Sequence, residues 1–182
     1  QLGNGSVGVV FNDGTKIVLA PDYSVFDYYE RRKLADGTRE SEETFERHTL
    51  TEWPARLKKK VALLKYFRDY LEGHSVHPVP QSVRLAESVP PALVYVKKWL
   101  HTADGLVVRL SNKTVQVNFT DHTKVVLTSH TQTVSYIDTT RRMSTFLVED
   151  THRPEFRHPA LEERLKKVKG ILTRLAGKTV KS

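Results

Sequence analysis

The sequence predicts an α+β fold with two copies of one module, each an antiparallel sheet followed by a helix. Three observations lead to this prediction. The chain repeats itself at a fixed offset, both copies alternate apolar and polar residues with a period of two, and each copy ends in a segment with helical spacing of apolar residues. Because a sheet with one apolar face must bury that face, we expect the two sheets to pack together as a β-sandwich.

The repeat relates residues 4–30 to residues 112–138 at an offset of 108 residues, without a gap. The same offset places the RLKK of residues 56–59 on the RLKK of residues 164–167. In the first copy, the ten identical positions are Asn4, Val7, Val9, Phe11, Asp13, Thr15, Lys16, Val18, Leu19 and Tyr28. This degree of identity without a gap predicts two copies of one structural unit.

Prolines separate the two copies and mark a linker, since four of them fall between residues 78 and 91. We therefore predict a first module over residues 1–75, a linker over 76–96 and a second module over 97–182.

Within each module, local patterns predict the elements. Val7, Val9 and Phe11 alternate with Ser6, Gly8 and Val10, as in a strand with one buried face. A proline in the first turn and a glycine at the end delimit the helix. In the first module the expected strands are 7–11, 15–20, 24–30 and 43–50, and the expected helix is 54–73. In the second module the expected strands are 114–119, 123–129, 133–138 and 143–150, and the expected helix is 158–177.

Charge and composition narrow the range of functions. The chain has 29 Lys and Arg residues against 21 Asp and Glu, and its net charge of +8 favours an anionic partner. The absence of cysteine excludes disulfides, thiolate metal sites and a cysteine nucleophile. No apolar run approaches the roughly 20 residues of a membrane span. Without a signal peptide or an initiator methionine, we interpret the chain as a fragment of an intracellular protein.

The stretch GNGSVGVV, residues 3–10, fits a glycine pattern that covers nucleotide phosphates in kinases. Its equivalent in the second copy, SNKTVQVN, keeps the strand alternation but has no glycine. The kinase sequences HRD and DFG do not follow, and Gly8 lies inside a strand pattern where a dinucleotide fold would begin a helix. We therefore interpret Asn4-Gly5 as a turn in which positive φ is readily adopted.

Four stretches together resemble the polo-box domain, the C-terminal part of Polo-like kinases. They are NGSVGVVFNDGTK, LLKYFRDYL, RLSNKTVQVNF and DHTK. The resemblance implies that each polo box is a six-stranded antiparallel sheet with a helix, and that a phosphopeptide binds in the groove between the two boxes. The first box is expected to be truncated and to lack a strand, because the counterparts of residues 98–106 would precede residue 1.

The resemblance assigns phosphate binding to His122 and Lys124 of the DHTK sequence. Residues two apart on a strand share a face about 6.5–7 Å apart, so two cations can flank one phosphate. In the first copy Gly14 replaces His122 while Lys16 matches Lys124, so one phosphate site in the second box is expected. Without the resemblance, Lys124 would be interpreted as a solvated strand lysine and His122 as a turn residue.

Further residues are assigned to peptide binding by the resemblance. Asn118 matches a peptide-contacting asparagine, and Ser75 and Val76 lie where the linker pairs with the peptide backbone. His101 stands where relatives often have an arginine near the peptide. The alternatives are an outward strand residue for Asn118 and plain linker for Ser75 and Val76.

An apolar set on the first helix, at i, i+3, i+4 and i+7, has two interpretations. In relatives, matching aromatic residues can open a secondary hydrophobic groove. The preferred interpretation is that these residues are core beneath an N-terminal cap. The set consists of Leu63, Tyr66, Phe67 and Tyr70.

The leading hypothesis is a non-catalytic reader of phosphoserine or phosphothreonine that targets and regulates an attached Polo-like kinase in cell division. The resemblance implies partners with a Ser-phosphoSer or Ser-phosphoThr sequence, and contact with the kinase domain of the same protein. No cofactor or metal is expected, since ATP would belong to a kinase domain outside this chain. The implied locations are cytoplasm and nucleus, at the centrosome or basal body, the kinetochore and the spindle.

Two other hypotheses stay open at this point. A scaffold or dimerisation module, including a homo-oligomer, would bind partners with little dependence on phosphate. Binding of nucleic acid or an acidic membrane through the positive charge is less favoured, because the aromatic residues are not interleaved with the basic runs.

Overall fold

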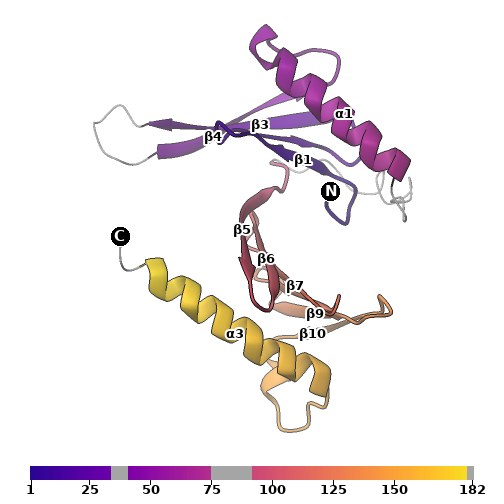
Figure 1. Cartoon of the computed structure of the whole chain (residues 1–182), viewed down its shortest axis with the longest axis vertical. Helices are drawn as coiled ribbons and strands as arrows, with labels where there is room; N and C mark the ends of the chain where they lie inside the picture. Colours follow the sequence, from indigo (N-terminus) through magenta and orange to yellow (C-terminus); the bar gives the residue numbers. More distant parts are fainter. Residues whose placement is uncertain (34–40, 75–91, 180–182) are drawn as a thin grey trace. The chain divides into compact units, whose positions relative to one another are not determined.

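The computed structural model of the chain describes residues 1–33, 41–74 and 92–179. The chain divides into two compact units, Gln1–Tyr95 and Val96–Ser182. Each unit contains one antiparallel sheet and one long helix, as Figure 1 shows. The predicted α+β fold with two copies of one module is therefore confirmed.

The first unit has a four-stranded sheet in the order β1-β2-β3-β4. Its elements are β1 (Val7–Val10), β2 (Lys16–Leu19), β3 (Val25–Lys33), β4 (Ser41–Thr49), the 3-10 helix η1 (Ala55–Leu57) and the helix α1 (Lys58–His74). One face of the sheet packs against α1, as alternation with a period of two requires. The buried core between them consists of Val7, Ile17, Leu19, Phe26, Tyr28, Leu57, Val61 and Leu64.

The second unit has a six-stranded sheet in the order β10-β9-β8-β7-β6-β5. Its strands are β5 (Val96–Thr102), β6 (Gly105–Leu110), β7 (Val115–Phe119), β8 (Lys124–Thr128), β9 (Thr133–Ile137) and β10 (Met143–Leu147). The 3-10 helix η2 (Asp150–His152) leads to the helix α3 (Pro159–Thr179). The buried core between sheet and helix consists of Val107, Val117, Phe119, Val125, Val134, Tyr136, Leu161, Val168 and Ile171.

The two sheets differ by two strands, which corrects the expectation of a single missing strand. By the repeat, β7–β10 correspond to β1–β4. The strands β5 and β6 have no counterpart among the described residues of the first unit. At the offset of the repeat, residues 96–108 have no counterpart within the chain.

The two helices align differently from what the RLKK match predicts. Lys60 of α1 pairs with Asp13 (Nζ–Oδ2 2.6 Å), whereas Arg164 of α3 pairs with Asp121. Asp13 and Asp121 are equivalent in the repeat, so Lys60 corresponds to Arg164 at an offset of 104 residues. Four residues are about one helical turn, and a shift of one turn preserves the apolar spacing that a sequence match detects.

Five turns in the described part of the chain share one closing pattern. In each, the first N–H donates to the carbonyl four residues later, and the fourth N–H donates back to the first carbonyl. This is the three-residue hairpin loop, which requires a left-handed residue at its fourth position. The left-handed residues are Gly5, Gly14, Lys113, His122 and Arg141. Gly5 has φ 96°, which confirms the interpretation of Asn4-Gly5 as a turn.

Candidate functional site

Three of the sequence-predicted site residues lie in one row across the second sheet. His101 pairs with Leu106, Leu106 with Asn118, and Asn118 with Lys124. Residues directly opposite each other in a sheet share a face, and neighbouring strands are about 4.8 Å apart. Asn118 and Lys124 are therefore adjacent, whereas His101 lies about 14 Å from Lys124, three strands away.

The row lies on the face of the second sheet that is opposite α3, which we call the helix-distal face. The neighbours Val117 and Val125 point to the other face, where they are buried in the core with α3. This alternation decides the orientation of Asn118, which the sequence left open. Val10, its counterpart in the first unit, is likewise on the face opposite α1, because it pairs with Lys16 outside the α1 core.

The side chains of the row offer hydrogen-bond donors. Lys124 is exposed, and its ammonium makes no hydrogen bond or ion pair with another described residue. The Gln116 amide donates to Asn118 Oδ1 (2.6 Å), which occupies the acceptor of Asn118 and leaves its NH2 group to donate. An ammonium and an amide NH2 on adjacent strands form a donor pair suited to an anion.

His122 lies in the turn that joins β7 to β8, two residues before Lys124. The turn is closed by Phe119 N–H to Thr123 O (2.9 Å) and by His122 N–H to Phe119 O (3.0 Å). His122 has φ 69° and an exposed side chain. A left-handed residue other than glycine costs about 1 kcal/mol, and such conformations often occur at functional sites.

Asp121 stabilises this turn through hydrogen bonds between its side chain and Thr123. Its Oδ1 accepts hydrogen bonds from the Thr123 N–H (3.1 Å) and the Thr123 hydroxyl (2.7 Å). The hydroxyl hydrogen bond is the main reason that the pKa of Asp121 is lowered from its usual value, and the charge of Arg164 adds to it. Asp121 is therefore a carboxylate at neutral pH.

The equivalent lysine of the first unit is not available to a ligand. Lys16 is only 8% exposed, and its ammonium pairs with Glu43 and lies 4.7 Å from the ring centre of Tyr95. Burial alone would raise the pKa of Glu43, but hydrogen bonds from Lys16 and Tyr95 outweigh this effect and lower it. The turn residue before Lys16 is Gly14, with φ 80°.

A buried carboxylate holds residues near the end of the predicted linker against the first sheet. Asp27 is 0% exposed and accepts two hydrogen bonds from Arg47, at 2.7 and 2.9 Å. It also accepts the Leu93 N–H (2.7 Å), while the Tyr29 hydroxyl donates to the Leu93 carbonyl (2.7 Å). Leu93 and Tyr95 are thereby buried on the face of the sheet opposite α1. Local sequence patterns do not predict this contact, because Asp27 and Leu93 are 66 residues apart.

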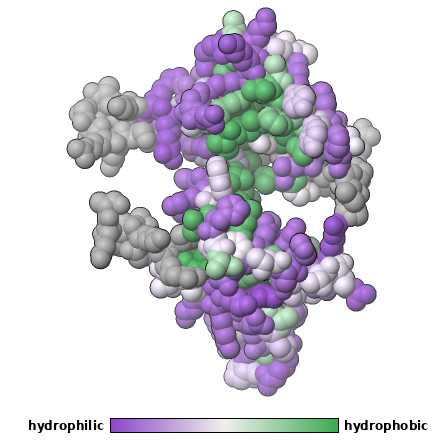
Figure 2. Space-filling view, in the orientation of Figure 1, coloured by the Kyte–Doolittle hydropathy of each residue, from purple (hydrophilic) through white to green (hydrophobic). Residues whose placement is uncertain are grey.

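The other predicted residues fall elsewhere. Ser75 and Val76 lie outside the described residues. The apolar set of α1 is between 40% and 63% exposed. The preferred interpretation was that these residues are core, but no described residue of the chain buries them. Figure 2 shows apolar surface over the α1 part of the first unit. The members of this set are Leu63, Tyr66, Phe67 and Tyr70.

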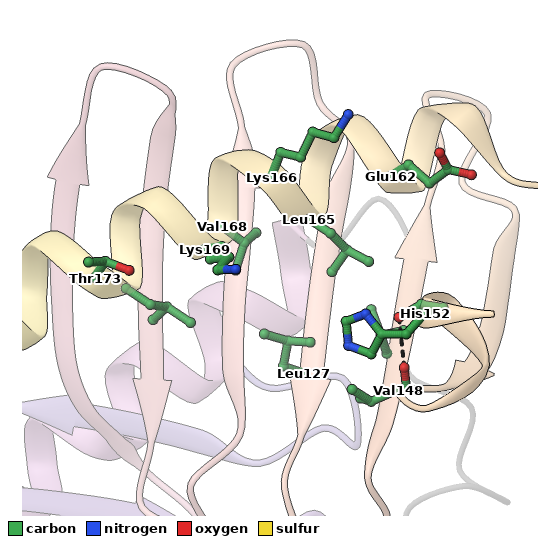
Figure 3. Close-up of a pocket in the computed structure, with 12 residues that line it drawn as sticks. Leu127, Val148, His152, Glu162, Leu165, Lys166, Val168, Lys169 and Thr173 are labelled. Atoms are coloured by element: carbon green, nitrogen blue, oxygen red, sulfur yellow. Dashed lines mark hydrogen bonds between the residues drawn. The ribbon is translucent and has the colours of Figure 1, made fainter. Parts of the chain in front are cut away.

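A cavity of about 490 Å³ lies beside α3, on the face of the second sheet opposite the row. Figure 3 shows Leu127 and Leu165 beside the cavity and His152 next to Val148. Its floor is apolar, which does not suit a phosphate. The cavity contains none of the sequence-predicted site residues.

Among the described residues, no group of three or more Asp, Glu or His side chains is arranged to hold a metal ion. No helix of the described chain is both long and apolar enough to span a membrane.

A family comparison decides what this fold is. The sequence model of the POLO box duplicated region matches residues 1–61 and 102–165. The chain belongs to the polo-box family. This result confirms the resemblance found in the sequence, and the matched region is a non-catalytic part of Polo-like kinases.

Two curated relatives of this polo-box chain are serine/threonine kinases. The chain is 41% identical over 137 residues to the probable serine/threonine-protein kinase CCRP1 of Zea mays, covering 75% of this chain and 21% of the maize protein. It is 37% identical over 180 residues to the serine/threonine-protein kinase plk-1 of Caenorhabditis elegans, covering 96% of this chain and 26% of the worm protein. The chain thus spans about a quarter of the length of such relatives or less.

Solved polo-box structures share the fold. The polo-box domain of budding yeast Cdc5, solved in complex with an Spc72 phosphopeptide, has a TM-score of 0.73 and 21% identity. That comparison covers 96% of this chain and 64% of the yeast chain. The Cdc5 domain in complex with the Dbf4 polo-interacting region gives a TM-score of 0.72 and 22% identity, covering 96% of this chain and 66% of the yeast chain.

Proposed function

We propose that this polo-box chain reads phosphoserine or phosphothreonine in partner proteins, with His122 and Lys124 as its phosphate-binding residues. The observation that carries the proposal is the contrast between equivalent lysines. Lys16 is paired with Glu43 and buried, whereas the exposed ammonium of Lys124 makes no ion pair with a described residue.

The chemistry of this part of the second box suits a phosphate monoester. A phosphate near neutral pH carries close to two negative charges and three acceptor oxygens. Lys124 offers an ammonium, His122 an imidazole N–H, and Asn118 an amide NH2 on the adjacent strand. Hydrogen bonds between charged partners are about twice as strong as neutral ones, so phosphate dependence should dominate affinity.

The relatives also support a role in phosphopeptide binding beside a kinase. The yeast Cdc5 domain was solved with a phosphopeptide, and the curated relatives are serine/threonine kinases. In a longer protein, this module would bring an attached kinase to partners that already carry a phosphate. The expected target sequence is Ser-phosphoSer or Ser-phosphoThr, with His101 near a more distant part of the peptide.

The test is a calorimetric titration of the chain with a Ser-phosphoThr-Pro peptide and with its unphosphorylated form. We expect binding to the phosphorylated peptide only. Two lost charge-assisted hydrogen bonds should weaken the His122→Ala/Lys124→Met variant by about a hundredfold or more.

Lys113→Met is the matched control. Lys113 is also an exposed, left-handed turn residue of the second sheet, but it lies at the opposite end of β7, about 17 Å along the strand. It should bind within about twofold of the wild-type chain, since one distant surface charge is largely screened by salt. An equal loss in both variants would point to general charge attraction and contradict the proposed site.

A phosphate-independent scaffold is the second candidate function. The observation in its favour is the exposed apolar set of α1, because large exposed apolar groups often mark protein interaction sites. This function predicts partner binding that survives the His122→Ala/Lys124→Met changes. The same titration, with equal affinity for both peptide forms, would favour it.

A further inference from the structure

The turn that carries His122 is tied to α3 by one arginine. Arg164 Nη2 donates to Asp121 Oδ2, and the Arg164 guanidinium carbon lies 4.8 Å from the ring centre of Phe119. The Arg164 side chain is only 15% exposed, so it is held between the helix and the turn. A single side chain thus contacts the first and third residues of the turn in which His122 is the fourth.

We propose that Arg164 is a positioning residue that holds His122 in its left-handed conformation, ready to contact the phosphate. This inference rests on the proposed function, since positioning matters only if His122 binds phosphate. Arg164 itself makes no contact with the phosphate in this proposal. It acts through Asp121 and Phe119.

Contacts from outside the loop can restrict the motion of the strained residue His122. A histidine with positive φ lies in a sparsely populated backbone region, so it persists only when its surroundings determine it. Asp121 uses both carboxylate oxygens for this purpose. Its Oδ1 accepts from Thr123 on the strand side, and its Oδ2 accepts from Arg164 on the helix side. The turn therefore cannot rearrange without breaking a contact with Thr123, the residue before β8, or with Arg164 of α3.

The first box contains the same arrangement without the histidine. Lys60 of α1 donates to Asp13 Oδ2 (2.6 Å) and lies 4.7 Å from the ring centre of Phe11. The left-handed residue of that turn is Gly14, which adopts positive φ without strain. A cation from the helix is thus a general feature of both boxes, and only in the second box does it support a left-handed histidine.

An arginine suits the second box better than a lysine would. Its planar guanidinium can hydrogen-bond to a carboxylate and stack on an aromatic face at the same time. Glu163 also approaches Arg164 (Nη1–Oε1 3.5 Å), which fixes the plane of the guanidinium further. An ammonium in this place would retain the charge of Arg164 but lose this directional hold.

The experiment compares Arg164→Met with Lys60→Met, a matched pair that removes the helix cation from one box each. Affinity for the Ser-phosphoThr-Pro peptide and for its unphosphorylated form is measured by calorimetry, with the melting temperature of each variant. If the binding-competent turn falls from nearly full occupancy to about one fifth, apparent affinity falls about fivefold. We therefore expect Arg164→Met to bind about fivefold more weakly and Lys60→Met to bind like wild type.

A second readout distinguishes positioning from general loss of structure. Backbone ¹⁵N relaxation at His122, measured without peptide, should show more motion in Arg164→Met than in the wild-type chain. In Lys60→Met the motion at His122 should be unchanged. Arg164→Lys, which keeps the charge and is the milder change if Arg164→Met does not fold, should restore only part of the affinity and part of the order.

Different results would contradict the positioning role and the proposed function. Wild-type affinity and unchanged relaxation at His122 in Arg164→Met would overturn the positioning role. Equal weakening in Lys60→Met would also overturn it, because the loss would then be general. A wild-type chain that binds both peptide forms equally would overturn the proposed function itself, and the positioning role with it.

Discussion

Lys16 and Lys124 occupy the same position of two equivalent strands, and the structure uses them in opposite ways. Both lie on the sheet face opposite the helix, each paired across the strands with the equivalent residue, Val10 or Asn118. Lys16 is surrounded by Glu43 and Tyr95, whereas Lys124 is exposed. A lysine repeated in both boxes is therefore structural or available to a ligand according to the residues that later segments place around it.

The same contrast holds for Asp27 and Ser135, which are also equivalent in the repeat. Asp27 is buried, paired with Arg47 and bonded to the Leu93 backbone. Ser135 shares a hydrogen bond with the hydroxyl of Thr145 (2.8 Å) in an exposed pair. In the first box this face therefore holds residues near the end of the predicted linker, whereas Ser135 of the second box makes no comparable contact among the described residues.

The largest effect is expected from Asp27→Ala. Removing this carboxylate leaves Arg47 without its partner and the Leu93 N–H without an acceptor, which should cost about 3 kcal/mol of unfolding free energy. Ser135→Ala should cost less than about 1 kcal/mol. Urea unfolding followed by fluorescence measures both. Because Trp53 and Trp99 lie in different units, a Trp99→Phe background makes Trp53 report on Asp27→Ala in the first box, and a Trp53→Phe background makes Trp99 report on Ser135→Ala in the second. Equal costs for the two variants would remove the contrast between the boxes.

The next effect sharpens the lysine comparison directly. Lys16→Met should lower the unfolding free energy by about 2 kcal/mol, between the values for exposed and fully buried ion pairs, without changing phosphopeptide affinity. Lys124→Met should do the reverse, with a stability change below about 0.5 kcal/mol and a large loss of affinity. Unfolding and titration of both variants form a two-by-two test. A stability loss in Lys124→Met similar to that in Lys16→Met would contradict it.

A smaller effect concerns the exchange of the two turn residues. His122→Gly should stabilise the second box by up to about 1 kcal/mol, because glycine adopts φ 69° without strain, and should weaken phosphopeptide binding. Gly14→His should cost about 1 kcal/mol, and only from backbone strain, since an added Cβ meets no atom within 4 Å. It should not create a phosphate site, because Lys16 stays paired with Glu43. Thermal melts and titration check both variants, and phosphate binding by Gly14→His/His122→Gly would disprove the role assigned to Lys16.

The smallest effect is a pH dependence in the first box. The pKa of Glu43 is lowered in the folded chain, so this carboxylate stabilises the fold fully above its ordinary pKa of 4.5, and the contribution is lost as pH falls below that value and through the lowered pKa. Glu43→Gln should therefore be less stable than wild type by under about 1 kcal/mol at pH 7. The difference should be smaller at an acidic pH below that value than at pH 7. Urea unfolding at both pH values measures it, and a constant difference would show that the charge of Glu43 is not responsible.

Local patterns in the sequence predicted β1–β4 and β7–β10 with their turns, because alternation and turn residues act over a few positions, but they did not predict β5 and β6. They could not predict the helix alignment, since a shift of one turn leaves the apolar spacing unchanged and the RLKK match is the more visible signal. The alignment became clear only from the contacts of Lys60 and Arg164 with the two turns.

The candidate site also has features that the sequence predicted and features that it could not predict. His122 and Lys124 were predicted through the resemblance, and the strand pairing adds that Asn118 lies beside Lys124 on the same face. The burial of Lys16 was not predictable, because it depends on Tyr95 and Glu43, which are distant in sequence and meet only in the folded chain. The support of the His122 turn by Arg164 depends equally on the fold.

The shared closing pattern of the five turns has a consequence for how such a module can change. In each turn, the bonds that close the loop involve only backbone groups, and the left-handed position carries a side chain that these bonds do not use. Glycine, lysine, histidine and arginine all occur there within this one chain. A new binding residue can therefore be introduced by one substitution at a loop tip, at a small and fixed cost in stability, while the strands and their register stay as they are.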